Sequence, residues 1–187
     1  NRHVAQKLRD AGLAPVLLDL LTHDEGIEDE ISGELRFDIG LLAGRLVTAT
    51  RFVRNDPRLR HLRVGYFGAS TGAGAALVAA AELPGDVAAV VSRGGRPDLA
   101  SADTLRRVVA PTLLIVGGED QVVLPLNRAA LAKLTSEKKL VVVPGASHLF
   151  EEPGKLDVVA GLAARWLGEH LGEKSSLDET GRPENRS

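Results

Sequence analysis

The chain has 187 residues, 44% of them hydrophobic, and its 23 Lys+Arg against 25 Asp+Glu give a formal net charge of −2. This predicts one globular domain and argues against a nucleic-acid partner, which would need a basic surface. The absence of cysteine excludes disulfides, a thiol nucleophile and cysteine-ligated zinc. No apolar run reaches the roughly 18 residues of a membrane span and we expect no secretory leader, so we predict a cytoplasmic protein with no membrane partner.

The first third of the chain is predicted to form a helix, a strand, a loop and a long helix. Apolar residues at helical spacing predict a helix over residues 3–12, which the glycine at position 12 ends. The mostly apolar residues 14–20 predict a strand buried on both faces, whereas the polar and acidic residues 22–33 predict a loop. An apolar stripe predicts a helix over residues 36–55, which an Asp-Pro pair ends.

Strands alternate with helices through the rest of the chain. The predicted strands are residues 62–67, 87–92, 111–116 and 140–143, and the predicted helices are residues 72–82, 125–134 and 155–171. This alternation is typical of an α/β fold, in which a mostly parallel sheet carries helices on both faces. Residues 172–187 have almost no apolar side chains, which predicts a disordered polar tail behind a core of residues 1–171.

A serine follows one predicted strand in the motif Gly68-Ala69-Ser70-Thr71-Gly72. A serine on a sharp turn between a strand and a helix adopts strained backbone angles, and bulky side chains at the two glycine positions would collide with the neighbouring strand and helix. Such a turn raises the hydroxyl above the sheet, near a helix N-terminus that favours developing negative charge. Ser70 is therefore a candidate nucleophile, and the alternative is an ordinary serine cap.

An aspartate and a histidine lie just beyond two later predicted strands. Ligands of parallel sheets bind at the carboxyl ends of the strands, where Asp120 and His148 are expected. His148 could accept the proton of Ser70 and later protonate the leaving group, while Asp120 could orient its imidazole. Glu119 is a neighbour that could be mistaken for the acid. The alternatives are a turn or capping aspartate and a surface-loop histidine.

The order Ser, Asp, His along the chain resembles that of the α/β-hydrolase superfamily. The segments VGYFGASTGAGAAL, APTLLIVGGEDQVV and VVPGASHLFEEPG resemble, more narrowly, those of the small dienelactone-hydrolase-like hydrolases. The resemblance covers the chain from Asn1 to about residue 171. It implies an α/β-hydrolase fold with Ser70 as nucleophile, Asp120 as acid and His148 as base, and with the Thr71 N–H as one donor of the oxyanion hole.

Two features depart from the pattern of this family. Dienelactone hydrolases proper use a cysteine nucleophile, whereas this chain has Ser70, which argues against dienelactone itself as the substrate. In the superfamily a further strand precedes the first helix, and the loop after that strand supplies the second oxyanion N–H. No such strand precedes the predicted helix of residues 3–12, and the chain has no methionine and opens on Asn1. We therefore predict that the core is truncated at its N-terminus.

Residues 92–111 carry the clues to the substrate. This interval is too short for the cap usually inserted there in the superfamily, so we expect no cap domain and an open pocket for small soluble esters. Arg93 and Arg96 are candidate binding residues for an anionic group, and the alternative is a solvated loop or one braced by Arg–Asp pairing. No phosphate-binding glycine pattern occurs, and the acidic residues 24–30 suit a solvated loop, so we expect no cofactor and no metal.

Two functions stay open from the sequence. The first is a serine hydrolase that cleaves a small soluble ester or related acyl compound through a Ser-His-Asp triad and an acyl-enzyme. The second is a non-catalytic protein with a hydrolase fold that binds a ligand or a partner. The complete order of the triad favours the first, and the missing oxyanion strand favours the second only if the natural protein begins at Asn1. The excess of arginine over lysine, with abundant alanine and glycine, hints at a bacterial source.

Overall fold

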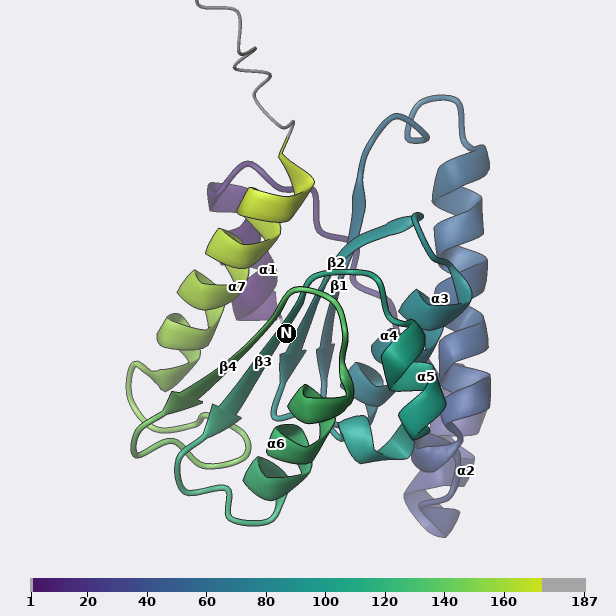
Figure 1. Ribbon diagram of the computed structural model, residues 1–187. Coiled ribbons are helices and arrows are strands. Elements are labelled where there is room, and N and C mark those ends of the chain that lie inside the picture. The colour runs from purple at the N-terminus through teal and green to yellow at the C-terminus, as the bar shows by residue number, and fades with distance from the viewer. Residues whose placement is uncertain (1, 173–187) are drawn as a thin grey trace, which may run out of the picture.

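The computed structural model describes residues 2–172, which form a parallel sheet between two layers of helices (Figure 1). The strands are β1 (Val64–Ala69), β2 (Val87–Arg93), β3 (Thr112–Gly117) and β4 (Lys138–Val143). They are hydrogen-bonded in that order, and all three neighbouring pairs are parallel. The predicted α/β fold with a parallel sheet is therefore confirmed.

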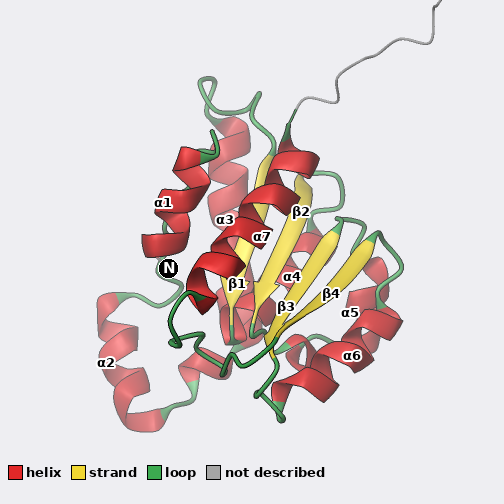
Figure 2. Ribbon diagram, turned by 90° about the vertical axis from the view of Figure 1, so that its left-hand side faces the viewer, coloured by secondary structure: helices red, strands yellow, loops and turns green. Residues whose placement is uncertain are grey.

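Helices cover both faces of this sheet (Figure 2). One face is covered by α3 (Ile39–Asn55), α4 (Thr71–Glu82), α5 (Ala102–Arg107) and α6 (Val123–Lys133). The other face is covered by α1 (Arg2–Asp10) and α7 (Lys155–Leu171), which pack on each other. Successive side chains of a strand point to opposite faces, so Val90 of β2 joins the first core and Val91 joins the second. Burial on both faces explains why β2 and β3 are continuous, mostly apolar runs.

The connection between β2 and β3 is short. It contains a 3₁₀ turn (Pro97–Leu99) and α5, and so no cap domain covers the carboxyl ends of the strands there. Separately, within residues 2–172 no helix combines the length and the apolar character needed to cross a bilayer.

The predicted strand at residues 14–20 is wrong. Residues 13–19 have no regular structure, and Val16, Leu17 and Leu18 are 82%, 56% and 46% exposed. An apolar run forms a strand only where a neighbour completes its backbone hydrogen bonds, and among the described strands β1 pairs with β2 alone. A groove of about 790 Å³ lies between this segment and β1 and is lined by residues of both, so the two segments do not form a ladder.

The predicted loop at residues 22–33 is also wrong, because most of it forms α2 (His23–Ser32). The Thr22 hydroxyl accepts the Glu25 N–H at 3.3 Å and the Glu25 carboxylate accepts the Thr22 N–H at 2.7 Å, which is a reciprocal helix cap. Gly33, with a φ of 68°, ends the helix in the left-handed region.

The remaining elements differ from the predictions at their ends. The long helix starts at Ile39 rather than at residue 36, because a 3₁₀ turn (Leu35–Phe37) precedes it and the Asp38 carboxylate accepts the Leu41 N–H at its first turn. The short helix α5 was not predicted. The predicted polar tail of residues 172–187 lies, apart from Gly172, outside the described residues.

Candidate active site

Ser70 lies at the turn between β1 and α4. Its φ of 50° and ψ of −124° are angles that side-chain-bearing residues rarely adopt. Its N–H donates to the Arg93 carbonyl at 3.2 Å, and its own carbonyl accepts the N–H groups of Ala73 and Arg96 at 3.1 and 3.0 Å. These bonds hold the turn, so the backbone strain expected from the motif is present at the candidate nucleophile.

The two glycines of the motif have different surroundings. A methyl group on Gly68 would lie 2.6 Å from both the Ala73 Cα and the Gly72 carbonyl oxygen. Only glycine therefore lets α4 begin so close to β1. A methyl group on Gly72 would meet the Leu20 Cδ1 at 3.8 Å, which is ordinary contact. A side chain is therefore excluded at Gly68, as the motif predicts, whereas a methyl group would fit at Gly72.

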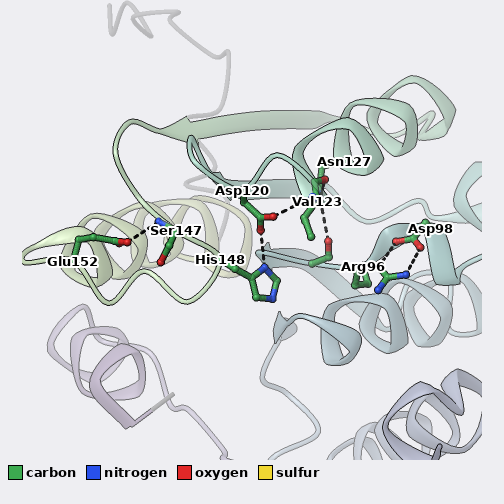
Figure 3. Close-up of polar contacts among 9 residues, drawn as sticks. Arg96, Asp98, Asp120, Val123, Asn127, Ser147, His148 and Glu152 are labelled. Carbon is green, nitrogen blue, oxygen red and sulfur yellow. Dashed lines mark hydrogen bonds and ion pairs between the residues drawn. The ribbon is translucent and has the colours of Figure 1, made fainter. Parts of the chain in front are cut away.

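Asp120 and His148 are in direct contact (Figure 3). The Asp120 Oδ2 lies 2.6 Å from the His148 Nδ1, and the Oδ1 accepts the Val123 N–H at 3.1 Å. Because a carboxylate can only accept, the imidazole donates from Nδ1. Its Nε2, on the opposite side of the ring, makes no hydrogen bond within residues 2–172. Asp120 is buried, whereas the His148 side chain is 37% exposed. Glu119, the other acid considered, is exposed and makes no described contact with the histidine.

The loop that carries His148 is held by backbone contacts. A methyl group on Gly117 would overlap the carbonyl oxygens of Ala146 and Ser147, so the end of β3 must be glycine for this loop to lie on it. The Ser147 N–H donates to the Glu152 carboxylate at 3.0 Å. Hydrogen bonding from Ser147, chiefly from its side chain, lowers the pKa of Glu152. The histidine is therefore presented by a fixed loop.

Ser70 and His148 meet the same short segment, residues 94–96. The Arg96 N–H binds the Ser70 carbonyl, and a methyl group on Gly94 would lie 3.4 Å from the His148 Nδ1. Within residues 2–172 no hydrogen bond joins the Ser70 hydroxyl to the imidazole. Catalytic hydrogen bonds are often long before a substrate binds, so this geometry is compatible with a triad.

Thr71 is the first residue of α4, where a backbone N–H has no acceptor within the helix. It also lines the groove beside β1. Its N–H is therefore free to hold a developing oxyanion next to Ser70.

The two candidate arginines have different surroundings. Arg96 forms an ion pair with Asp98, in which its Nε and Nη2 donate to the carboxylate at 2.8 and 2.7 Å. This pairing raises the pKa of Arg96 and lowers that of Asp98. Arg93 ends β2 beside Ala69 and makes no ion pair among the described residues. Its Nε is buried without an acceptor there, and burial lowers the pKa of its guanidinium.

Asn127 on α6 was missed from the sequence. It is fully buried and donates from Nδ2 to the Gly95 carbonyl at 2.9 Å (Figure 3). The available signal was a polar residue at helical spacing between Val123 and Ala130, which are also buried. In the part of the chain that the structure describes, no group of three His, Cys, Asp or Glu side chains could hold a metal ion.

A family model described as the dienelactone hydrolase family matches residues 2–167. The crystal structure of a dienelactone hydrolase from Anabaena variabilis matches with a TM-score of 0.88 and 60% identity, over 91% of this chain and 79% of that one. Est1E from Butyrivibrio proteoclasticus matches with a TM-score of 0.73 over 91% of this chain and 82% of its own, and at 16% identity it shares the fold alone.

A longer relative is also similar. A protein of Mycobacterium tuberculosis strain H37Rv, provisionally named a phosphoribosyl transferase, is 58% identical over 171 residues. The match takes in 91% of this chain and 38% of that protein, so the chain spans less than two fifths of the relative's length. The family model covers nearly all the described residues, and the resemblance found in the three motif segments is confirmed: the chain belongs to the dienelactone hydrolase family.

Proposed function

We propose that this chain is a serine hydrolase that cleaves a small soluble ester or a related acyl compound. One observation carries the proposal: Asp120 contacts His148 at 2.6 Å at the edge of the sheet where Ser70 occupies a strained turn. A buried carboxylate on one imidazole nitrogen fixes the tautomer in which the other nitrogen acts as a base. Membership of a hydrolase family supports the same reaction class.

The reaction is an acyl transfer in two steps. The Ser70 Oγ attacks the ester carbonyl carbon while its proton passes to the His148 Nε2, and the Thr71 N–H stabilises the oxyanion. The C–O bond to the alcohol breaks, and the imidazolium returns the proton to that alcohol. Water, deprotonated by His148, then attacks the acyl carbon. The bond from that carbon to the Ser70 Oγ breaks, the imidazolium returns its proton to the Oγ, and the acid leaves.

Steady-state hydrolysis of p-nitrophenyl acetate and butyrate tests this function. We expect Ser70→Ala and His148→Ala to lower kcat/KM by at least about a thousandfold, because members of a triad act as a unit. Asp120→Asn should cost about 10⁴ because it allows the wrong tautomer. Glu119→Gln is the matched control and should keep wild-type activity. Equal activity of wild type and Ser70→Ala would contradict the proposal and favour a non-catalytic binding protein.

For the substrate, we propose that Arg93, and not Arg96, receives an anionic group. A half-buried guanidinium without a carboxylate is costly, and an anion that binds it would recover a charge-assisted hydrogen bond. Arg96 already has Asp98. The chain's partner would then be a small acyl compound with a carboxylate or phosphate group near the ester.

A matched pair of substrates tests this assignment. Arg93→Gln should lower kcat/KM for mono-p-nitrophenyl succinate at least about tenfold more than for p-nitrophenyl butyrate, since a hydrogen bond to a charged group is worth about 1.5–3 kcal/mol. Arg96→Gln should leave the ratio unchanged. Equal losses on both esters in Arg93→Gln would refute the anion site and leave the hydrolase proposal intact.

The transferase activity in the name of the M. tuberculosis relative is not proposed for this chain. The matched region makes up 38% of that protein, and every site feature described above suits acyl transfer. The cytoplasmic location stays a prediction.

A further inference from the structure

Residues 94–96 lie between the candidate nucleophile and the candidate base. At one end the Arg96 N–H donates to the Ser70 carbonyl at 3.0 Å. At the other end Gly94 lies against His148, and a methyl group there would be 3.0 Å from the histidine carbonyl oxygen and 3.4 Å from the ring Nδ1 and Cε1. The distance between the serine and the imidazole therefore depends on where this segment sits.

Asn127 binds the middle of that segment from a fully buried position on α6. Its Nδ2 donates at 2.9 Å to the Gly95 carbonyl and at 2.9 Å to the Val123 carbonyl, whereas its Oδ1 has no described partner. A buried amide with an unpaired oxygen costs stability, and apolar residues usually fill such helix positions. What the amide adds, and an apolar residue could not, is a fixed bond to Gly95.

The same helix is tied to the candidate acid. The Asp120 Oδ1 accepts the N–H of Val123, the first residue of α6, at 3.1 Å, and the Oδ2 binds the His148 Nδ1. One turn further along, Asn127 reaches residues 94–96 (Figure 3). The first turns of α6 thus contact the histidine through Asp120 and the segment beside the serine through Asn127.

We propose that Asn127 is a positioning residue of the hydrolase site, which sets the geometry of Ser70 relative to His148 by holding the Gly95 carbonyl. The inference rests on the proposed serine-hydrolase function. Asn127 touches neither substrate nor reacting atoms in this account. Its loss is expected to lower kcat and leave KM for a small ester nearly unchanged, because binding does not depend on the serine–imidazole geometry whereas proton transfer does.

The test compares Asn127→Leu with Thr112→Val. Leucine has a similar size and removes only the polar contacts. Thr112→Val breaks another buried hydrogen bond, 2.9 Å long from the Thr112 hydroxyl to the Ala110 carbonyl, at the start of β3 and so at the end of the strand opposite to the site. With concentrations corrected to folded protein, we expect Asn127→Leu to lower kcat on p-nitrophenyl acetate about ten- to a hundredfold with KM within twofold. Thr112→Val should keep wild-type kcat. Equal kcat in the two variants would overturn the proposal.

A second variant and a second readout test the proposal if Asn127→Leu does not fold or if wild type shows no turnover. If Asn127→Leu does not fold, Gly94→Ala, which displaces the same segment against His148, should give the same loss of kcat, and an unchanged kcat would overturn the proposal. If wild type shows no turnover, the hydrolase proposal fails by itself. The low-field NMR signal of the His148 Nδ1 proton then decides: a shift in Asn127→Leu, absent in Thr112→Val, supports the positioning role, and identical spectra refute it.

Discussion

Replacing each glycine of the Gly-Ala-Ser-Thr-Gly turn by alanine should give opposite results. In Gly68→Ala the new methyl group lies 2.6 Å from backbone atoms of α4, against the roughly 3.5–4.0 Å that two carbon atoms prefer. The start of α4 must therefore move by about 1 Å. Eight of the 12 residues of α4 are buried, so the helix has little room to move.

The expected cost lies at the upper end of the range for overpacking, about 3 kcal/mol, because backbone atoms cannot escape by changing rotamer. Gly72→Ala meets only ordinary contact and gains helix propensity in the first turn, so its free energy of unfolding should stay equal or rise by up to about 1 kcal/mol. Urea denaturation followed by far-UV circular dichroism measures both, with the m-value as the check on two-state unfolding. Stabilities of the two variants within about 0.5 kcal/mol of each other would refute this reasoning.

Three further changes test the core, the buried phenol and the histidine loop. Leu77→Ala, at a fully buried position of α4, should lower the free energy of unfolding by about 2–5 kcal/mol in the same urea assay, and a loss under about 1 kcal/mol would be inconsistent with a packed core. Burial raises the pKa of Tyr66, although its hydrogen bond to Thr50 acts the other way. The stability that the neutral Tyr66 phenol contributes is therefore complete below about pH 10 and is lost as the pH rises further. Between about pH 9 and 11 the free energy of unfolding should fall less in Tyr66→Phe than in wild type, and parallel curves for the two proteins would contradict this. Gly117→Ala should push back the loop that presents His148 and lower esterase kcat/KM at least about tenfold with helical content retained, and unchanged activity would show that the loop tolerates the methyl group.

Much of the fold could be predicted because its two central strands, β2 and β3, are buried on both faces. β2 and β3 are runs of apolar residues between clear helical segments, and their order in the sheet follows their order in the chain. The run at residues 14–20 has the same composition but no hydrogen-bonding neighbour among the described residues. Composition indicates whether a segment prefers burial, and only the tertiary arrangement decides whether a ladder partner is present.

The helix α2 shows the opposite error. Its acidic composition suggested a solvated loop, yet Thr22 and Glu25 form a reciprocal cap that the spacing T-x-x-E already indicated. The hydrogen bonds of this cap stabilise the first turn of α2 although most residues of the helix are polar. The T-x-x-E spacing of Thr22 and Glu25 is thus the sequence signal for the start of this helix.

For the candidate site, the positions at the ends of strands could be predicted, but the contacts that hold them could not. A parallel sheet brings the segments after β1, β3 and β4 to one edge, and the contact of Asp120 with His148 follows from that rule. The bond from Asn127 to Gly95 joins residues 32 positions apart, and the packing of Gly94 on His148 joins residues from different loops. Such contacts depend on how α6 is placed, which no local pattern encodes.

The most direct test of the central claim is the intact mass of the protein after treatment with a fluorophosphonate probe. The account predicts a single adduct on wild type, located at Ser70 by peptide mapping, no adduct on Ser70→Ala, and slow labelling of His148→Ala, because only an activated serine attacks phosphorus at a useful rate. Folded wild type that stays unlabelled, or equal labelling of Ser70→Ala, would contradict an activated nucleophile at this turn.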